Sequence, residues 1–350
     1  MLSQRMTHLT PYVAGEQPRD RRYIKLNTNE NPYPPTTKVA RFLKRVNHNV
    51  LRLYPDPKMM SLREVIAERE GLGPENVFAG NGSDEILSFC FYAFFDSALF
   101  PELTYTFYPV YCDFYSIPKS VVPIKPDFGI DLDAFLSREQ QGPVIFANPN
   151  SPTGMYLEKA EIERFLDCYN PESVVVVDEA YIAFGGESCA GLIASHKNLV
   201  VIRTLSKSHS LAGLRLGYAL ADKPIIDALF TVKDSFNSYP VHTLAQELGT
   251  RALLDSAANR SNIEKIIATR EWTAESLLRM GWNVLPSKSN FLFCSLPARG
   301  GAFVYKEMKE RGILVRYFDK ERLKEFVRIS IGTKSQMRTL LNAAREIAEV

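Results

Sequence analysis

The stretch VVVVDEAYIAFGGESCAGLIASHKNLVVIR, residues 174–203, decides the fold class. It contains two apolar, β-branched runs, VVVV and LVVI, whose continuous apolarity is typical of strands buried on both faces of a parallel sheet. Between the runs, ESCAGLIASH (187–196) has the apolar spacing of a helix, which predicts a crossover helix. VIFA, residues 144–147, is a further run of the same kind. Residues 75–220 are therefore predicted to form an α/β domain.

Outside this region the pattern changes. The first 45 residues are rich in proline and predict an extended arm. Residues 241–280 are strongly helical without an internal proline, and we expect them to form a long connection to a second domain. The rest of the chain alternates between strand-like and helix-like segments and predicts a small α+β domain: NFLFCSL (290–296), AFVYKEMKERG (302–312), ILVRYF (313–318), FVRISIG (326–332) and SQMRTLLNAAREIAEV (335–350).

The composition indicates a compact cytoplasmic protein that binds neither nucleic acid nor a membrane. Its 350 residues exceed what one hydrophobic core usually holds, so two domains are expected. The net charge of +2 gives no signal of a polyanion-binding surface, and no run reaches the roughly 18 apolar residues of a membrane span. The five cysteines are odd in number and widely spaced, which is typical of buried thiols in a reducing compartment. Neither cysteines nor histidines have metal-binding spacing, and we expect no metal site.

Polar side chains follow the predicted strands at the points where they end. VIFA runs into NPNSPTG, which places Asn148 and Asn150 just past its end, VVVV runs directly into Asp178, and LVVIR is followed by TLSK, which ends in Lys207. Ligands of open parallel sheets gather at the carboxyl ends of the strands. We therefore expect Asn150, Asp178 and Lys207 to face one ligand.

The segment AGNGSDE, residues 79–85, predicts an anion-binding turn. Gly80 and Gly82 free the backbone for a tight turn, and Ser83 is placed to cap a helix whose apolar positions follow at helical spacing. The N–H groups at such a helix start bind phosphate. Asp84 and Glu85 in the first turn would repel an anion, so we expect both to point away from it.

These groups together favour one cofactor. Pyridoxal 5'-phosphate needs an amine to bond its aldehyde, a carboxylate to keep its ring nitrogen protonated, and anion-binding groups for its phosphate. Lys207, Asp178 and the GNGS turn supply these three requirements.

The order and spacing of LNTNENPY, YPD, GNGSDE, ANPNSPTG, VDEAY and TLSKSHSLAGLRLGY resemble the fold-type I pyridoxal-phosphate aminotransferases, and within them the histidinol-phosphate aminotransferase family. The resemblance covers nearly the whole chain. It implies a large domain with a mostly parallel seven-stranded sheet covered by helices, and a smaller α+β domain. With it, the expected division is an N-terminal arm with part of the small domain at 1–45, the large cofactor-binding domain at 46–255 and the small C-terminal domain at 256–350.

The resemblance also implies roles for residues around the cofactor ring. Lys207 anchors the cofactor covalently and later moves the substrate's proton, and Asp178 pairs with the protonated ring nitrogen. Asn150 and Tyr181 hydrogen-bond the phenolic oxygen of the ring, and Tyr105 stacks on the ring face.

The cofactor phosphate has its own set of implied ligands. The backbone at Gly82 and Ser83 and the side chains of Ser206 and Arg215 hold it. Tyr54, in the motif YPD, reaches it from the other subunit of a homodimer.

The substrate's anions are expected to bind two arginines. In ILVRYF the alternation places Arg316 on the same face as Leu314 and Phe318, and in FVRISIG it places Arg328 on the face of Ser330. The resemblance makes both arginines, together with Asn150, substrate-binding residues, with Tyr12 closing over them from the arm. A guanidinium suits a carboxylate or a phosphate, so one pair can serve both L-histidinol phosphate and glutamate or 2-oxoglutarate.

Three other functions fit parts of the sequence. An aromatic amino-acid aminotransferase would differ mainly in the substrate pocket, and a threonine-phosphate decarboxylase uses the same frame and also binds a phosphate. A non-catalytic regulator that binds the cofactor would need a DNA-binding module, for which the N-terminal position of the motifs leaves no room.

Overall fold

The computed structural model describes residues 2, 6, 9–297 and 299–349. Its largest feature is a seven-stranded sheet with the strand order β2-β8-β7-β6-β5-β3-β4. Only β8 runs antiparallel to its neighbours, β2 and β7. The α/β class and the mostly parallel seven-stranded sheet are therefore confirmed. The strands are β2 (Val77–Gly80), β3 (Ala98–Pro101), β4 (Lys119–Val122), β5 (Val144–Ala147), β6 (Val175–Asp178), β7 (Leu199–Thr204) and β8 (Gly217–Ala221).

Alternate residues of the central strands pack on opposite faces of this sheet. Val175 and Val177 of β6 belong to one hydrophobic core, whereas Val176 belongs to another on the opposite face. All three side chains are fully buried, which is why the strand is apolar at every position. The helices that cover the two faces are α2 (Met60–Glu70), α3 (Gly82–Phe94), α4 (Phe107–Tyr115), α5 (Leu132–Leu136), α6 (Lys159–Cys168), α8 (Lys223–Phe236) and α9 (Thr243–Leu253).

The crossover between β6 and β7 differs from the prediction. Residues 187–196 form no α-helix, and the connection contains only the short 3-10 helices η4 (Ile182–Phe184) and η5 (Cys189–Leu192). The buried carboxylate of Glu179 explains the difference, because it accepts hydrogen bonds from the Ser188 hydroxyl at 2.7 Å and from the Cys189 N–H at 2.6 Å. These bonds fix the segment to the end of β6 in place of a helical turn.

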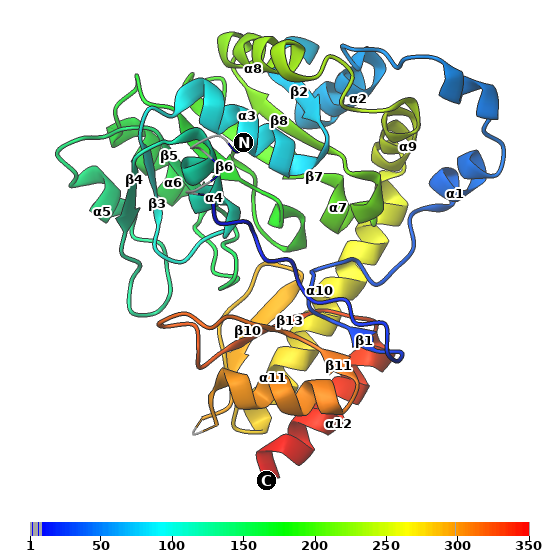
Figure 1. Ribbon diagram of the computed structural model, residues 1–350, viewed down its shortest axis with the longest axis vertical. Coiled ribbons are helices and arrows are strands. Elements are labelled where there is room, and N and C mark those ends of the chain that lie inside the picture. The colour runs from blue at the N-terminus through cyan, green and yellow to red at the C-terminus, as the bar shows by residue number, and fades with distance from the viewer. Residues whose placement is uncertain (1, 3–5, 7–8, 298, 350) are drawn as a thin grey trace.

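A second, smaller part contains the C-terminal elements, and the long helix α10 (Ser256–Arg279) runs from the large sheet toward it (Figure 1). Its four strands are antiparallel in the order β12-β13-β10-β9. A separate parallel pair joins β1 to β11. The elements of this part are β1 (Ile24–Lys25), β9 (Asn283–Val284), β10 (Phe291–Ser295), α11 (Gly300–Glu310), β11 (Ile313–Leu314), β12 (Arg316–Tyr317), β13 (Val327–Ser330) and α12 (Lys334–Glu349).

Several local predictions need correction. The helical stretch 241–280 is interrupted between α9 and α10, at residues 254–255. The segment 313–318 divides into β11 and β12, which belong to different sheets. Cys168 is exposed, whereas the other four cysteines are buried as predicted. The last predicted helix ends at Glu349, and Val350 lies outside the described residues.

The N-terminal segment is extended over most of 9–35 and passes between the two parts of the molecule (Figure 1). Contrary to the prediction of an extended arm throughout, α1 (Thr37–Leu43) lies within the first 45 residues. The 3-10 helices η2 (His48–Arg52) and η3 (Pro74–Asn76) follow it. The domain boundaries at 45 and 255 stay predictions.

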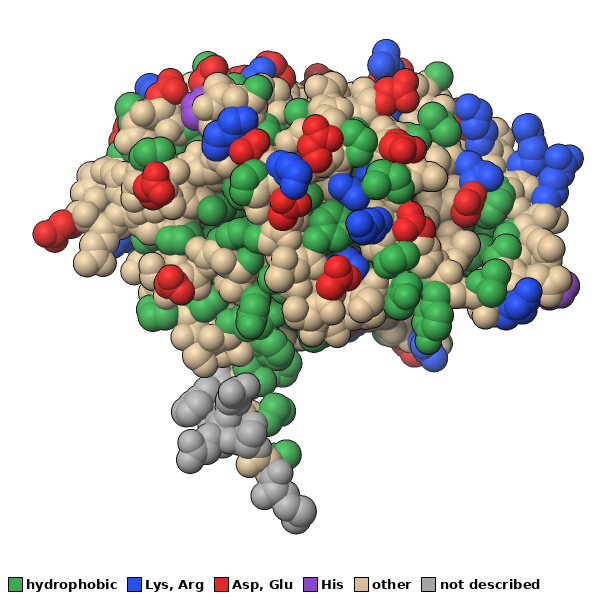
Figure 2. Space-filling view, turned by 90° about the horizontal axis from the view of Figure 1, so that it is seen from above, with side chains coloured by type: hydrophobic (Ala, Val, Ile, Leu, Met, Phe, Trp, Pro, Cys, Tyr) green, Lys and Arg blue, Asp and Glu red, His purple; other side chains and the backbone are tan. Residues whose placement is uncertain are grey.

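The surface seen in Figure 2 mixes acidic and basic side chains, except for a group of lysines and arginines at one end. None of the helices in the described part of the chain has the length and apolar character needed to cross a membrane.

Candidate active site

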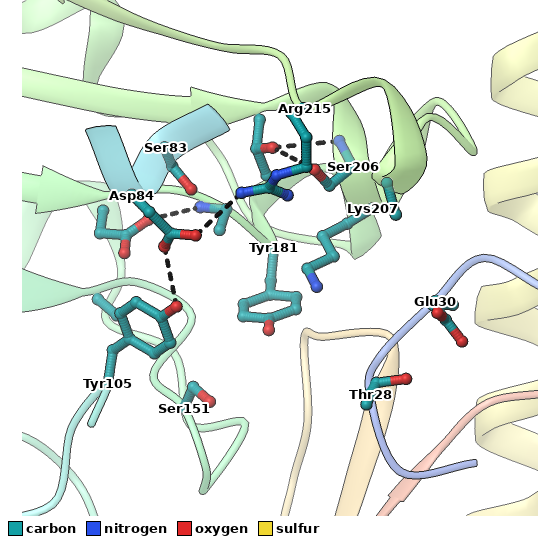
Figure 3. Close-up of a pocket in the computed structure, with 15 residues that line it drawn as sticks. Thr28, Glu30, Ser83, Asp84, Tyr105, Ser151, Tyr181, Ser206, Lys207 and Arg215 are labelled. Atoms are coloured by element: carbon teal, nitrogen blue, oxygen red, sulfur yellow. Dashed lines mark hydrogen bonds and ion pairs between the residues drawn. The ribbon is translucent and has the colours of Figure 1, made fainter. Parts of the chain in front are cut away.

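A cavity of about 240 Å³ lies at the carboxyl ends of β5, β6 and β7. Figure 3 shows the Lys207 amine and the Tyr181 ring pointing into the same space, with Asp84 and Arg215 on one side and Glu30 of the N-terminal segment on the other. The structure thus brings together segments that are far apart in the sequence. Seven of the predicted cofactor residues line the cavity: Ser83, Tyr105, Asp178, Tyr181, Ser206, Lys207 and Arg215.

Asp178 is the last residue of β6 and is almost completely buried. Burial raises the pKa of its carboxyl from 3.8 to about 6, although hydrogen bonds from the Tyr108 hydroxyl at 3.0 Å and the Ala180 N–H at 3.1 Å oppose the rise. No cation pairs with Asp178 within the described residues. A cationic ring nitrogen would therefore stabilise the ionised carboxylate.

Lys207 lies on the short helix α7 (Leu205–Ser208), directly after β7. Thr204 caps this helix, because its hydroxyl accepts a hydrogen bond from the Ser206 N–H at 3.1 Å. The Asn31 amide donates to the Lys207 carbonyl at 3.0 Å and so attaches the N-terminal segment to the same turn. The Lys207 Nζ is 5.9 Å from the centre of the Tyr181 ring. These hydrogen bonds fix the backbone of the turn that carries Lys207, and its amine points into the cavity (Figure 3).

The start of α3 is the turn for which anion binding was predicted. Gly82 has a φ of +81°, and a Cβ there would lie 2.6 Å from the Arg215 guanidinium. A Cβ on Gly217 of β8 would lie 2.6 Å from the Ser83 nitrogen. The two glycines therefore leave the first N–H groups of α3 and Arg215 close to one another.

The caps of α3 differ from the prediction. Asn81 is the N-cap residue and Ser83 lies inside the first turn, so Ser83 does not cap the helix with its side chain. The Glu85 carboxylate instead accepts the Asn81 N–H at 2.7 Å. Ser83 lines the cavity, and Figure 3 shows its hydroxyl there.

Asp84 does not point away from the site, contrary to the prediction. Its carboxylate accepts a hydrogen bond from the Tyr105 hydroxyl at 2.9 Å and one from Arg215 at 3.0 Å. Two donors on either side explain why it turns into the cavity (Figure 3). Burial, with the Asp84 charge as a second cause, raises the pKa of Tyr105 well above its usual value, so Tyr105 stays a hydrogen donor.

Asn150 is fully buried but is not among the residues that line the cavity. Its amide Nδ2 donates to the Leu103 carbonyl at 2.8 Å and to Thr153 at 3.2 Å, and its Oδ1 has no hydrogen-bond partner among the described residues. Asn148 likewise exchanges two hydrogen bonds of 2.9 Å with the backbone of Leu157. These contacts hold the loop after β5, and the contact of Asn150 with a cofactor stays a prediction.

Arg316 and Arg328 are direct neighbours on β12 and β13. Like charges placed opposite each other on antiparallel strands repel. Burial, with the Arg316 charge as an additional cause, lowers the pKa of Arg328. Neither arginine has a carboxylate partner within the described residues; Arg328 donates only to Ser151 at 3.3 Å and to the Asn27 carbonyl at 3.2 Å. The pair is suited to bind an anion that is not part of this chain.

Arg316 also holds the N-terminal segment. Its guanidinium donates to the carbonyls of Val13 at 2.9 Å and Ala14 at 3.3 Å. The Tyr12 ring lies next to Arg316 in a second cavity of about 650 Å³, 4.5 Å from the centre of the Phe107 ring. Tyr12 and Arg316 line this same cavity, and the closure of Tyr12 over both arginines stays a prediction.

Tyr54 does not line the cavity of its own chain. Its side chain is 82% exposed and stacks on Tyr239, with ring centres 4.6 Å apart. Hydrophobic side chains near it in the sequence, Leu51 and Leu53, are also exposed.

Several residues of the site were not predicted from the sequence, among them Thr28, Glu30, Ser151 and Thr204 in the cavity lining, and Tyr108 and Asn29 beside it. Tyr108 donates to Asp178, but it lies on α4 among other aromatic residues, and nothing in its sequence distinguishes it from core. Asn29 donates to the Tyr181 hydroxyl at 2.9 Å. Asn29 lies in the motif LNTNENPY, and the presence of this motif could have indicated that Asn29 belongs to the site.

The comparisons with known proteins agree with this geometry. The family model described as aminotransferase class I and II matches residues 21–343. The histidinol-phosphate aminotransferase of Syntrophus aciditrophicus is 52% identical and covers 99% of this chain and 98% of its own.

Solved structures share the fold at lower identity. The histidinol-phosphate aminotransferase of Sinorhizobium meliloti, in complex with pyridoxal-5'-phosphate, has a TM-score of 0.85 at 22% identity and covers 94% of this chain and 92% of its own. The L-threonine-O-3-phosphate decarboxylase of Porphyromonas gingivalis has a TM-score of 0.81 at 25% identity and covers 93% and 100%. The fold is therefore common to more than one reaction.

Proposed function

Because this chain belongs to the class I and II aminotransferases, we propose that it transfers the amino group of L-histidinol phosphate to 2-oxoglutarate, with pyridoxal 5'-phosphate as cofactor. The products are imidazole acetol phosphate and glutamate, and the reaction belongs to histidine biosynthesis. The observation that carries the proposal is one cavity that contains Lys207, the buried Asp178 and the phosphate-binding turn at Ser83. The full-length similarity to histidinol-phosphate aminotransferases supports the choice of substrate.

The residues present fit this cofactor. The buried carboxyl of Asp178 without a cationic partner suits a protonated ring nitrogen. The turn at Gly82, where a Cβ would meet Arg215, suits a phosphate group. When bound, pyridoxal phosphate withdraws electrons from the carbon that bears the substrate's amino group and so makes its proton acidic.

The chain's own groups then have separate tasks. The Lys207 amine would bond the cofactor's aldehyde carbon. Once the substrate's amino group displaces it, the free amine would take the proton from the substrate carbon and deliver it to C4' of the cofactor. Arg215, the Ser83 and Ser206 hydroxyls and the N–H groups at the start of α3 hold the phosphate. The Tyr181 hydroxyl donates a hydrogen bond to the phenolic oxygen. Lys207 and Ser206 lie on the short helix after β7, Ser83 lies in the first turn of α3, and Arg215 lies in the turn before β8.

Arg316 and Arg328 bind the substrate's anionic groups. Two guanidiniums that have no carboxylate partner in the described part of the chain can bind the phosphate of histidinol phosphate in one half-reaction and a carboxylate of 2-oxoglutarate in the other. Tyr12 and the backbone at Val13 lie beside Arg316 and close this side of the site.

Replacing Arg328 with glutamine is expected to raise the KM for both amino donor and 2-oxoglutarate by at least about tenfold, because a charge-assisted hydrogen bond contributes roughly 1.5–3 kcal/mol. Steady-state kinetics with each substrate measure the effect. Arg311→Gln at the C-cap of α11, which removes an arginine paired with Glu307 and Glu346, is the control and should leave both KM values unchanged. Unchanged KM values in Arg328→Gln would contradict the assignment.

We also propose that the protein is a cytoplasmic homodimer in which Tyr54 reaches the cofactor phosphate of the partner subunit. The exposed ring of Tyr54, which does not line the cavity of its own chain, supports this arrangement. Exposed leucines around it supply apolar surface for such an interface.

Single-turnover spectroscopy tests the proposed reaction. Purified protein loaded with pyridoxal phosphate is mixed with histidinol phosphate, phenylalanine or threonine phosphate in separate experiments. Conversion to the pyridoxamine form by histidinol phosphate is the expected result. Conversion by phenylalanine alone would assign an aromatic amino-acid aminotransferase, and release of carbon dioxide from threonine phosphate would assign the decarboxylase.

A further inference from the structure

Asn29 joins three segments of the chain behind the cavity. It is 2% exposed and has a φ of +54°, a left-handed conformation that is uncommon outside glycine. Its backbone N–H donates to the Ser330 hydroxyl of β13 at 2.8 Å, and its carbonyl accepts the Asn290 amide at 3.0 Å. Its side-chain Nδ2 donates to the Tyr181 hydroxyl at 2.9 Å. These hydrogen bonds fix the orientation of the Asn29 side chain, and so they determine which of its amide atoms contacts the Tyr181 hydroxyl.

The direction of each hydrogen bond in this group follows from the backbone. The Asn29 N–H can only donate, so the Ser330 oxygen accepts it. The Ser330 hydrogen then has Asn29 Oδ1 as its acceptor, at 2.8 Å. With Oδ1 engaged by Ser330, the Nδ2 group faces Tyr181.

The opposite orientation of the amide is less favourable. Ser330 would then accept two hydrogen bonds, and its own hydrogen would have no other acceptor recorded within the described residues. Its side chain is 2% exposed, so solvent offers little compensation.

The hydrogen of the Tyr181 hydroxyl therefore points away from Asn29. Its oxygen accepts from Asn29, and the described part of the chain provides no acceptor for the hydrogen. Tyr181 lines the cavity, and its ring is held perpendicular to that of Phe291, with the ring centres 5.1 Å apart. The hydrogen is free to donate into the cavity.

We propose that Asn29 is a positioning residue that makes Tyr181 a hydrogen donor toward the cofactor. This inference rests on the proposed function, in which Tyr181 donates to the phenolic oxygen of the cofactor. A donor there stabilises the deprotonated oxygen and so lowers the pH at which the bound cofactor changes its absorbance. Ser330 sets the amide orientation and lies two residues after Arg328 on β13, so the same strand carries a substrate-binding arginine and orients Tyr181 through Asn29.

Asn29→Asp tests the proposal, because a carboxylate of the same shape can only accept from Tyr181 when ionised. The probe is pyridoxal phosphate bound to the whole protein, and the measurement is the pH midpoint of its visible absorbance change. In Asn29→Asp we expect the midpoint to rise by about one pH unit, since the Tyr181 hydrogen turns toward residue 29. The dissociation constant of the cofactor, measured by titrating the cofactor-free protein, is expected to rise about tenfold. Asn29→Ala provides a second variant, with a smaller change in the same direction.

The same substitutions in a Tyr181→Phe background separate positioning from a general structural role. Tyr181→Phe alone is expected to raise the midpoint, and adding Asn29→Asp or Asn29→Ala should then change nothing further. Equal shifts with and without the Tyr181 hydroxyl, or no shift in either Asn29 variant, would overturn the role of Asn29 while leaving the aminotransferase assignment standing. Failure of the unsubstituted protein to bind pyridoxal phosphate would overturn the proposed function and this inference together.

Discussion

Replacing Lys207 with alanine is expected to lower the rate of transamination at least about 10⁴-fold, because one amine both bonds the cofactor and moves the substrate's proton. No other lysine lines the cavity, so the described residues offer no replacement amine there. The fold should be unaffected, since the contacts that hold residue 207 are made by its backbone carbonyl and by Thr204.

Borohydride reduction followed by peptide mass analysis measures the covalent bond directly. In the unsubstituted protein the cofactor mass should appear on the peptide that contains residue 207, and in Lys207→Ala it should be absent. Lys223→Ala is the control, because Lys223 is an exposed lysine paired with Asp227 on α8. A trapped adduct that persists in Lys207→Ala would reject Lys207 as the anchor.

The strand ends were predictable from the sequence for a physical reason. A strand buried on both faces needs apolar side chains at every position, so its last buried residue and the first polar one are visible in the chain itself. Asp178 is the last residue of β6 and Lys207 lies three residues after the end of β7, and parallel strands bring such ends to one edge. The location of the cavity could thus be predicted from the apolar runs and from the rule that ligands bind at the carboxyl ends of parallel strands.

The contacts within the site were not predictable in the same way. Asp84 turns into the cavity because Tyr105 and Arg215 donate to it, and Arg215 is 131 residues away in the sequence. Asn29 is 152 residues from Tyr181 and 301 from Ser330. Such contacts depend on side-chain rotamers and on the packing of distant segments. The spacing of apolar residues along the sequence does not predict either.

Local patterns also failed where a buried polar group competes with helix formation. Residues 187–196 have helical spacing, yet Glu179 takes the Ser188 hydroxyl and the Cys189 N–H as hydrogen-bond donors. A buried carboxylate needs such donors, and satisfying it outweighs the modest preference of ten residues for a helix.

Asp178→Asn is expected to stabilise the cofactor-free protein and to impair the enzyme. The pKa of Asp178 in the folded protein is raised from 3.8 to about 6, so the folded form holds this proton more tightly than the unfolded chain. The stabilisation from this proton is present at low pH and is lost as the pH rises from about 4 to 6. At 1.36 kcal/mol per pH unit the loss is about 3 kcal/mol above pH 6.

Asparagine at position 178 carries no charge, so the variant does not lose free energy of unfolding through ionisation of this residue. Urea unfolding of the cofactor-free variant should therefore give a larger free energy of unfolding than the unsubstituted protein at pH 8, with a smaller difference at pH 5. Asp227→Asn, at an exposed position on α8, is the control and should show no such pH-dependent gain.

The same change should weaken the loaded enzyme, because a protonated ring nitrogen would lose the buried carboxylate proposed to pair with it. Leaving one member of a buried ion pair without its partner costs about 3–5 kcal/mol, which corresponds to a loss of at least about 100-fold in cofactor affinity or rate. In the unsubstituted protein, cofactor affinity should fall as the pH drops below about 6, where Asp178 takes up its proton. A variant that loses stability and cofactor affinity together would show that Asp178 serves the fold. A gain in stability with a loss of affinity would show that the buried charge is kept for the cofactor at the expense of the fold.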